Sequence, residues 1–316
     1  MAAVRKRKRY RGRRLRPQFI LFCAVMLALL CGLVLLVRRA PVFRRPADTP
    51  SATREIVETP EPKENDVPAG FVPAEGDIHA GSLILVSNEH PYTFPAEVEL
   101  VTTLEQNISG YMARDYSVKQ EKTAFAAFDA LFRAFADTTG RQDVNISSAY
   151  RSYDEQQEVY AASAAENGEA HAASYVTQPG CSEHHTGLAV DLTRYDVRTG
   201  HSYDFTGEGE YGWIHTHGPE YGVVMRYAAD KESITGIAEE TWHLRYVGVP
   251  HAAYMAEHNL CLEEYLDLLR SYPVTNPLRY NGCHIYFCPE GQLVVPESGN
   301  YTVSGNNVDG FVVTIP

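Results

Sequence analysis

Basic residues are scarce in this sequence outside its first 45 positions. Residues 46–316 hold 15 Lys and Arg against 40 Asp and Glu, whereas residues 1–45 hold 13 Lys and Arg and no acidic residue. Nucleic-acid binding needs clustered basic side chains that neutralise phosphates. The acidic balance of the larger part therefore argues against nucleic acid as a partner.

Two motifs of common enzyme classes are missing as well. The sequence contains neither a G-x-S-x-G nucleophile elbow nor a glycine-rich phosphate-binding loop. Serine-hydrolase and nucleotide-dependent mechanisms therefore lack the residues that they require.

Cysteine is too sparse for a disulfide scaffold. The 316 residues include six cysteines, two of them in the apolar run 19–37. The other four allow three pairings if all are oxidised: Cys181, Cys261, Cys283 and Cys288. On one strand, Cys283 and Cys288 would face opposite sides and could not pair with each other. We interpret Cys181 as a buried structural residue rather than a nucleophile.

Residues 19–37 (FILFCAVMLALLCGLVLLV) carry no charge. As a helix, this run would span roughly 28 Å, close to the thickness of the hydrocarbon core of a bilayer. Residues 1–18 hold nine basic residues, against four just after the run, which predicts a cytoplasmic N-terminus. No small-x-small cleavage site follows the run. We therefore expect an uncleaved single-pass transmembrane anchor in the cell membrane, with the body on the extracytoplasmic side.

Composition divides the rest of the chain into three parts. Residues 38–78 hold seven prolines and few large apolar residues, which is typical of an extended spacer. Residues 271–316 contain short β-type runs (HIYF, QLVV, YTVS and GFVVTI) between turn signals, and they predict a small β-rich module with a structural or adhesive role. The main folded domain is expected at residues 79–270.

Residues 79–270 mix helical and strand patterns. Phenylalanines at helical spacing predict a helix over Lys119–Thr138. A capping box of Ser152 and Glu155, with Gly168 downstream, predicts a second helix. A further helical segment is expected from Pro250 towards Arg270. The expected short strands are Val144–Tyr150, Gly187–Leu192, Gly222–Tyr227 and Thr241–Val247.

Asp191 lies on a strand pattern that leaves room beside its carboxylate. Alternation puts Gly187, Ala189 and Asp191 on one face, opposite the larger apolar residues. His184 and His185 precede Asp191 by seven and six residues, and a catalytic zinc site takes about three ligands of these types. A solvated aspartate on a strand is the alternative interpretation.

Two other stretches carry candidate site residues. In EETWHLRYVG (residues 239–248), an extended chain places His243 and Arg245 opposite an apolar face, so their face either borders a site or is simply hydrated. Arg151 follows a predicted strand directly. An arginine there can stabilise an oxyanion or hold a substrate carboxylate, although an isolated arginine is more often a surface residue.

Together, these stretches resemble the VanY-type D-alanyl-D-alanine carboxypeptidases, which are zinc peptidases of bacterial peptidoglycan. The resemblance covers roughly residues 80–270 and implies an α+β fold, with a small antiparallel sheet surrounded by helices. The motif S-x-H-x-x-G-x-A-x-D is matched by Ser182, His184, Gly187, Ala189 and Asp191. The motif E-x-W-H-x-R-Y-V-G is matched by Glu240, Trp242, His243, Arg245, Tyr246, Val247 and Gly248, and Y-R-S-x-x-x-Q by Tyr150, Arg151, Ser152 and Gln156.

The resemblance also implies a role for each matched site residue. His184, Asp191 and His243 would bind Zn²⁺, with water in the fourth position, and Glu240 would be the general base. Arg151 would stabilise the tetrahedral oxyanion. The remaining two residues, Gln156 and Ser182, would hold the terminal residue of the substrate.

Other residues compete for these roles. On a regular strand, Glu240 and His243 would face opposite sides, so the assignment requires a turn or bulge near Glu240 and Thr241. Glu239 has the parity of His243 but starts farther away. His185 could replace His184 as a ligand, although the motif aligns only with His184. His215 and His217 form an H-x-H pair that we expect in a loop away from any metal.

The expected function is removal of the C-terminal D-amino acid from peptidoglycan stem peptides by a membrane-anchored zinc carboxypeptidase. An L,D-carboxypeptidase or a dipeptidase of the same fold is an alternative. A non-catalytic wall-binding module is another, and the presence of Glu240 beside three metal ligands speaks against it.

Overall fold

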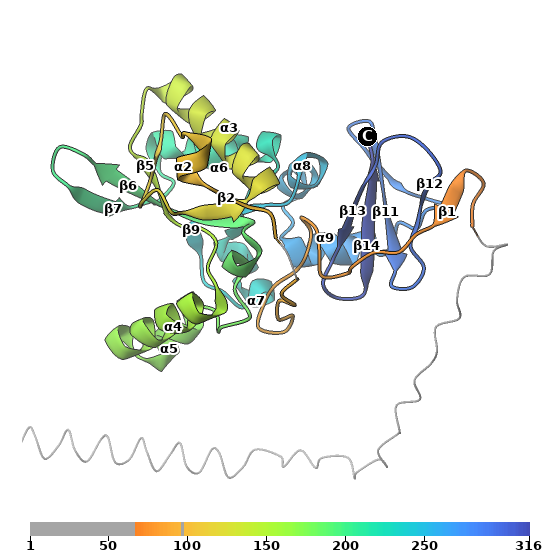
Figure 1. The fold of residues 1–316 in the computed structure, drawn as a ribbon, viewed down its shortest axis with the longest axis horizontal. Helices are drawn as coiled ribbons and strands as arrows, with labels where there is room; N and C mark the ends of the chain where they lie inside the picture. The colour runs from red at the N-terminus through yellow and green to blue at the C-terminus, as the bar shows by residue number, and fades with distance from the viewer. Residues whose placement is uncertain (1–66, 96–97) are drawn as a thin grey trace, which may run out of the picture. The chain divides into compact units, whose positions relative to one another are not determined.

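The computed structural model describes residues 67–95 and 98–316 (Figure 1). All described residues belong to one compact unit. The anchor predicted at residues 19–37 lies outside the described residues, as does the basic segment before it. Within the described ranges, no helix combines the length and the apolar character that a membrane span needs.

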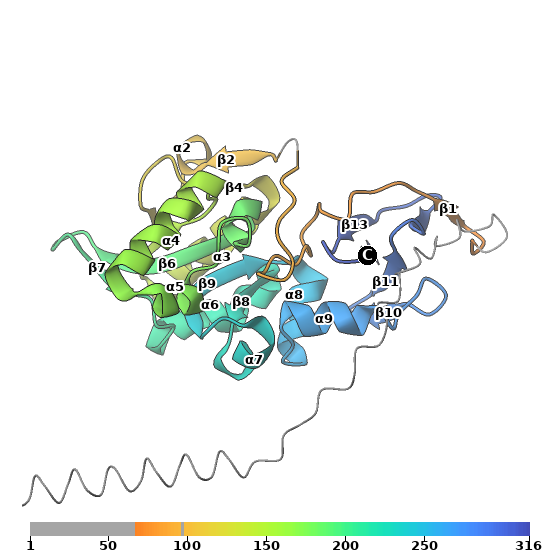
Figure 2. The ribbon, with the colours of Figure 1, turned by 90° about the horizontal axis from the view of Figure 1, so that it is seen from below.

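A six-stranded sheet forms the centre of the described part (Figures 1 and 2). Its strands are β3 (Met112–Ala113), β5 (Val144–Ser148), β6 (Ala189–Asp196), β7 (His201–Asp204), β8 (Val223–Tyr227) and β9 (Glu240–Tyr246). The order is β3-β5-β6-β9-β8, with β7 paired to β6 outside this path. All pairs are antiparallel except β3 with β5. The predicted α+β fold with a small antiparallel sheet is confirmed for this part of the chain.

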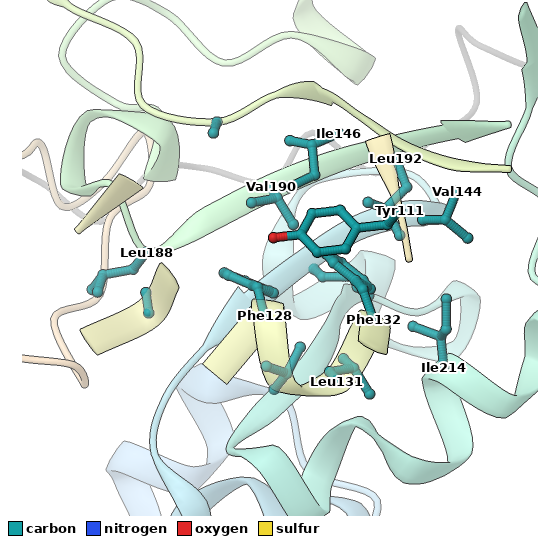
Figure 3. Packing of buried hydrophobic residues seen from close by; sticks show 14 of the residues in the cluster. Tyr111, Phe128, Leu131, Phe132, Val144, Ile146, Leu188, Val190, Leu192 and Ile214 are labelled. Atoms are coloured by element: carbon teal, nitrogen blue, oxygen red, sulfur yellow. The ribbon is translucent and has the colours of Figure 1, made fainter. Parts of the chain in front are cut away.

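Helix α3 (Lys122–Thr139) covers one face of this sheet. Glu121 caps its first turn by accepting a hydrogen bond from the Ala124 amide at 2.8 Å. The buried side chains of α3 pack against β5 and β6, as Figure 3 shows for Phe128, Leu131, Phe132, Ile146, Val190 and Leu192. The alternation of side chains predicted for this strand therefore places the apolar residues of β6 in the core.

The start of α3 differs from the prediction. Lys119–Glu121 form strand β4, which pairs with β2 (Leu100–Thr102) ahead of the short helix α2 (Thr103–Gln106). Because the Glu121 side chain caps the helix, the three residues expected to open it stay extended.

The opposite side of the sheet carries α4 (Tyr153–Asn167) and α5 (Glu169–Tyr175) (Figure 1). The predicted capping box of Ser152 and Glu155 is formed, and Gly168 ends α4. Gln156 is the one buried residue of α4. This helix therefore contributes little to the core and directs Gln156 inward.

Several short elements connect the strands. They are η2 (Glu183–Thr186), η3 (Gly209–Tyr211), α6 (Gly212–His217), η4 (Gly218–Tyr221), η5 (Ala229–Lys231) and α7 (Glu232–Thr235). After β9, two helices replace the single segment predicted towards Arg270: α8 (Val249–Glu257) and α9 (Leu262–Leu269). Asn259 adopts a left-handed φ of 50° between them, and the Cys261 amide donates to Glu264 at 3.0 Å to cap α9. The left-handed residue and the new cap explain the break.

The C-terminal residues are β-rich, as predicted. Strands β10 (Leu278–Tyr280), β11 (Cys283–Pro289), β13 (Thr302–Gly305) and β14 (Gly310–Ile315) form a sheet of order β10-β11-β14-β13. Strand β12 (Val294–Pro296) pairs instead with β1 (Phe71–Pro73). Phe71 and Ile78 pack onto this β-rich part. The spacer predicted for residues 38–78 is therefore corrected at its C-terminal end, where its apolar residues are folded.

The β-rich part also shares a core with the preceding domain. Leu83 and Leu85 pack in one cluster with residues of α8 and α9 and with Ile285 and Val312. All four cysteines in the described part are free. The boundary expected at residues 270 and 271 therefore separates two patterns of secondary structure and not two independent cores.

Candidate metal centre and active site

Two neighbouring strands bring Asp191 and His243 together. Asp191 on β6 lies directly opposite His243 on β9 in the antiparallel register. His184 comes from η2, the short turn that precedes β6. Ser182 caps this turn by accepting from the His184 amide at 3.3 Å. Gly187 ends the turn at φ 72°, where an added Cβ would lie 2.7 Å from the backbone nitrogen of Glu121, so only glycine fits.

The side chains of His184, Asp191 and His243 converge on one point. One ligand atom from each residue lies within 4.8 Å of the others, in the one such group found among residues 67–95 and 98–316. Nε2 of His184 is 3.1 Å from Oδ2 of Asp191, and Nδ1 of His243 is 3.0 Å from Oδ1. The three candidate ligands named from the sequence are thus brought together.

Hydrogen bonds fix the tautomer of His184, whereas both ring nitrogens of His243 contact carboxylates. Nδ1 of His184 lies 2.6 Å from the carbonyl oxygen of Ala149; because a carbonyl only accepts, Nδ1 carries the proton. Nε2 of His184 is buried and makes no hydrogen bond, although Oδ2 of Asp191 lies 3.1 Å from it; a metal bound by both atoms would satisfy them. Two imidazole nitrogens and one carboxylate oxygen form a donor set that suits Zn²⁺. The residues present therefore fit the metal.

Electrostatics distinguish the two histidines. Burial, with the Arg151 charge, lowers the pKa of His184 to about 4, so this ring is neutral and able to bind metal. Burial alone would also lower the pKa of His243, but hydrogen bonds to Asp191 and Glu183 raise it to about 9. Burial raises the pKa of Asp191, yet its contacts with both histidines hold that pKa well below the ordinary value.

Glu240 reaches the site through an irregularity in β9. Tyr227 pairs with Glu240 and Met225 with Leu244, so two residues of β8 span four of β9. This bulge, which the family assignment required, brings Oε2 of Glu240 to 3.7 Å from Nδ1 of His243. Burial raises the pKa of Glu240 to about 7. Glu239 is exposed, so the rival carboxylate does not lie in the site.

Arg151 and Gln156 both present unpaired polar atoms. Nη2 of Arg151 is 3.6 Å from Oδ2 of Asp191, and its buried Nε has no partner. Burial lowers the pKa of Arg151. Gln156 donates from Nε2 to the Thr177 carbonyl at 2.8 Å and leaves Oε1 buried and unpaired. Such groups are poised to bind a ligand.

All seven residues predicted for the site line one cavity of about 190 Å³. The list is Arg151, Gln156, Ser182, His184, Asp191, Glu240 and His243, and the walls are completed by Val159, Tyr175, Val176, Thr177, Glu183, Tyr227, Ile237 and Trp242. The cavity therefore joins a candidate metal centre, a buried carboxylate and unpaired polar atoms.

His185 has a different role from its neighbour. Its Nδ1 donates to the Arg151 carbonyl at 2.7 Å, and its Nε2 accepts from the Gly180 amide at 3.0 Å. Both ring nitrogens are satisfied, so His185 is not available as a ligand. It instead fixes the backbone that carries Arg151.

The H-x-H pair is not at the metal centre, and it lies in helix α6 rather than in the predicted loop. His217 pairs with Glu220. Nε2 of His215 lies 2.8 Å from the Thr241 carbonyl oxygen, inside the β9 bulge. His215 thus supports the conformation that places Glu240, a role that the sequence pattern did not indicate.

Comparisons with known proteins agree with this site. The VanY family profile, described as D-alanyl-D-alanine carboxypeptidase, matches residues 117–249. A D-alanyl-D-alanine carboxypeptidase of Enterococcus faecium is 32% identical over 249 residues, which cover 76% of this chain and 77% of that protein. One of Enterococcus faecalis is 32% identical over 70% of this chain and 78% of its own length.

A solved structure is similar over much of the chain. The vancomycin-resistance D,D-dipeptidase VanXYg, in complex with a D-Ala-D-Ala phosphinate analogue, has a TM-score of 0.63 and 33% identity. The match covers 75% of this chain and 94% of that one. With the matched motifs and the converging site, the chain belongs to the VanY family of D-alanyl-D-alanine carboxypeptidases.

Proposed function

We propose that this protein is a zinc-dependent D-alanyl-D-alanine carboxypeptidase that removes the C-terminal D-amino acid from peptidoglycan stem peptides. The observation that carries the proposal is the convergence of His184, Asp191 and His243 beside the buried Glu240. In this assignment the first three residues hold the metal. Zn²⁺ in such a site acts as a Lewis acid and lowers the pKa of a water ligand to about 7.

Glu240 is the general base in this scheme. A pKa of about 7 lets its carboxylate take a proton near neutral pH and later release it to the leaving amine. Its burial in the cavity wall keeps bulk water away from that transfer. Arg151, with an unpaired Nε, stabilises the negative charge that develops on the scissile carbonyl oxygen.

Gln156 and Ser182 are assigned to the terminal residue of the substrate. The unpaired Oε1 of Gln156 is an acceptor for a substrate amide N–H, because its own amide group is held by the Thr177 carbonyl. Ser182 lines the same cavity, and its Oγ already accepts from the His184 amide. Its hydroxyl proton remains a donor towards a substrate carboxylate.

A second cavity favours a peptide over a dipeptide as the substrate. It has a volume of about 290 Å³ and shares Thr177, Tyr227 and Ile237 with the site. Ser87 and Asn88, in the loop after Leu85, line part of the rest, together with residues 233–236. We assign this space to the part of the stem peptide that precedes the scissile bond.

The test is mass spectrometry of defined stems after incubation with residues 59–316 or the full chain, with and without a chelator. We expect a pentapeptide ending in D-Ala-D-Ala to lose one D-alanine in a chelator-sensitive reaction. Loss from a tetrapeptide alone would identify an L,D-carboxypeptidase, and cleavage of free D-Ala-D-Ala alone a dipeptidase. No cleavage of any stem would support the non-catalytic alternative.

We also propose that residues 19–37 anchor the protein in the cell membrane, with the N-terminus cytoplasmic and the catalytic domain extracytoplasmic. The uncharged run and the nine basic residues before it support this topology. Protease added to intact cells, with the outer wall layers removed, should digest the catalytic domain and spare a tag fused to residue 1. Protection of the domain would contradict the topology.

A further inference from the structure

Glu183 is a completely buried carboxylate between Ser182 and His184, and the sequence motif gave it no role. Its side chain is 0% exposed. Oε1 accepts from Nη1 of Arg245 at 2.7 Å and from Nε of Arg226 at 2.8 Å. Oε2 lies 3.3 Å from Nε2 of His243. One carboxylate thus joins two arginines to a metal ligand.

Glu183 belongs to a cluster of buried charges that compensate one another. Arg226 also makes a two-bond contact with Glu263 of α9, at 2.9 and 2.7 Å. The remaining Arg245 donors go to the carbonyls of Ser82, Ile84 and Tyr246. Two arginines and two carboxylates therefore compensate one another, as buried charges must.

The contact with Glu183 determines which nitrogen of His243 faces the metal position. An ionised carboxylate only accepts, so Oε2 binds the proton on Nε2 of His243. Nδ1, the other ring nitrogen, lies 3.0 Å from Oδ1 of the candidate ligand Asp191, so a metal held by Asp191 would replace a proton on Nδ1 and leave the Nε2 proton with Glu183. Partners of this kind fix the tautomer and ring orientation of metal-binding histidines.

The geometry points to Glu183 as a positioning residue for the metal centre: held by Arg226 and Arg245, it orients His243 and selects the tautomer that presents Nδ1 to the metal. This inference rests on the proposed zinc site and adds to it a residue outside the ligand set. Glu183 borders the site cavity but is not a reacting group in this scheme, since its oxygens are occupied by the two arginines and His243.

Glu183→Gln tests this inference because a glutamine side chain has one acceptor oxygen, whereas the Glu183 carboxylate accepts from the two arginines and from His243. Its oxygen is needed by the two arginines, which only donate, so its NH₂ group would face Nε2 of His243. That arrangement favours the proton on Nδ1, the nitrogen that should bind zinc. We expect the zinc dissociation constant, measured by competition with a chromophoric chelator, to rise about 10–100-fold.

Glu263→Gln is the matched control. Like Glu183→Gln, it removes a negative charge that pairs with Arg226. Glu263, however, has no contact with His243. We expect its zinc dissociation constant to stay within about threefold of the wild-type value, a change small beside that of a lost positioning partner. Thermal unfolding in chelator measures what each variant costs the metal-free protein. Equal losses of zinc affinity in both variants would show a general effect of charge removal and would overturn the inference.

A measurement on the wild-type protein does not depend on whether a variant folds. Long-range ¹H–¹⁵N correlation spectra of the zinc-loaded protein should show the His243 proton on Nε2. A proton on Nδ1 would overturn the inference. Neither measurement uses a peptide: a protein that gives the expected zinc affinities and tautomer but cleaves no stem would refute the proposed function alone. A wild-type protein that binds no zinc would overturn both.

Discussion

The side chains on the two faces of strands β6 and β9 are buried among different kinds of neighbour. One face sends Val190 and Leu244 into an apolar cluster against α3. The other presents Asp191, His243 and Arg245, which are held by ion pairs and hydrogen bonds. The apolar face gains stability from every contact, whereas the polar face contains groups that are costly to bury and are arranged for chemistry. Alternation along the same two strands thus separates stability from function.

The polar face itself contains two kinds of carboxylate. Glu183 is surrounded by arginine donors, whereas Glu240 has no arginine within ion-pair distance in the described structure. Burial accordingly leaves the pKa of Glu240 at about 7. The difference in partners predicts that Glu183 supports the site while Glu240 exchanges protons.

Glu240→Gln should give the largest functional effect. Removing the base should lower kcat for stem-peptide hydrolysis by about 10²–10⁴-fold, while zinc content measured by elemental analysis stays at one ion per chain. The exposed neighbour provides the control, and Glu239→Gln should keep the wild-type rate. A fully active Glu240→Gln protein would rule out this residue as the base.

Phe128→Ala tests the apolar face. Phe128 is fully buried and stacks with Phe132, so its truncation should lower the free energy of unfolding by about 3–5 kcal/mol. Leu104 is 66% exposed, and Leu104→Ala should stay within about 0.5 kcal/mol. Denaturant titration measures both. At a temperature where the Phe128 variant remains folded, its zinc affinity should equal that of the wild type; a loss would mean that the two faces are not separate.

Arg151→Lys tests the charge that faces the substrate. Lysine keeps the positive charge but loses the guanidinium geometry, so kcat should fall by about 10²–10³-fold with zinc still bound. The control is Arg198→Lys: the Arg198 side chain is 88% exposed, so this substitution should leave kcat unchanged. If Arg151→Lys raised KM and left kcat unchanged, the residue would bind the substrate without stabilising the transition state.

Acid should remove activity before it unfolds the protein. The Glu240 pKa is raised to about 7, so its carboxyl group is protonated below that pH and cannot take a proton. We expect kcat/KM to fall about tenfold per pH unit below the pKa, with a pH profile as the measurement. The residual rate of Glu240→Gln should lack this dependence; the same profile in that variant would assign the titration to another group.

Local patterns in the sequence predicted the faces of the strands, and the resemblance to the family supplied the set of candidate ligands. A period of two placed Asp191 and His243 on polar faces, and the motif fixed His184 over His185. The need for a bulge before His243 also followed from counting residues along β9. These features depend on neighbours in sequence, which is why they could be inferred.

Contacts between distant segments could not be predicted in the same way. The pairing of β1 with β12 joins residues more than 200 positions apart, and nothing in the proline-rich composition near Phe71 indicates it. The break between α8 and α9 was missed because a cysteine, rather than serine or threonine, opens the capping box. Glu183 received no role from the sequence, since its partners Arg226 and Arg245 lie on strands distant in the chain.

The register that sets Asp191 opposite His243 has a consequence for the stability of the fold. A metal held by both residues would close a loop of 52 residues, in a chain whose described cysteines form no cross-link. A ligand that binds only the folded state adds stability as its concentration rises. Zinc would then stabilise the folded state reversibly, so that the metal concentration would affect the stability of the enzyme as well as its activity.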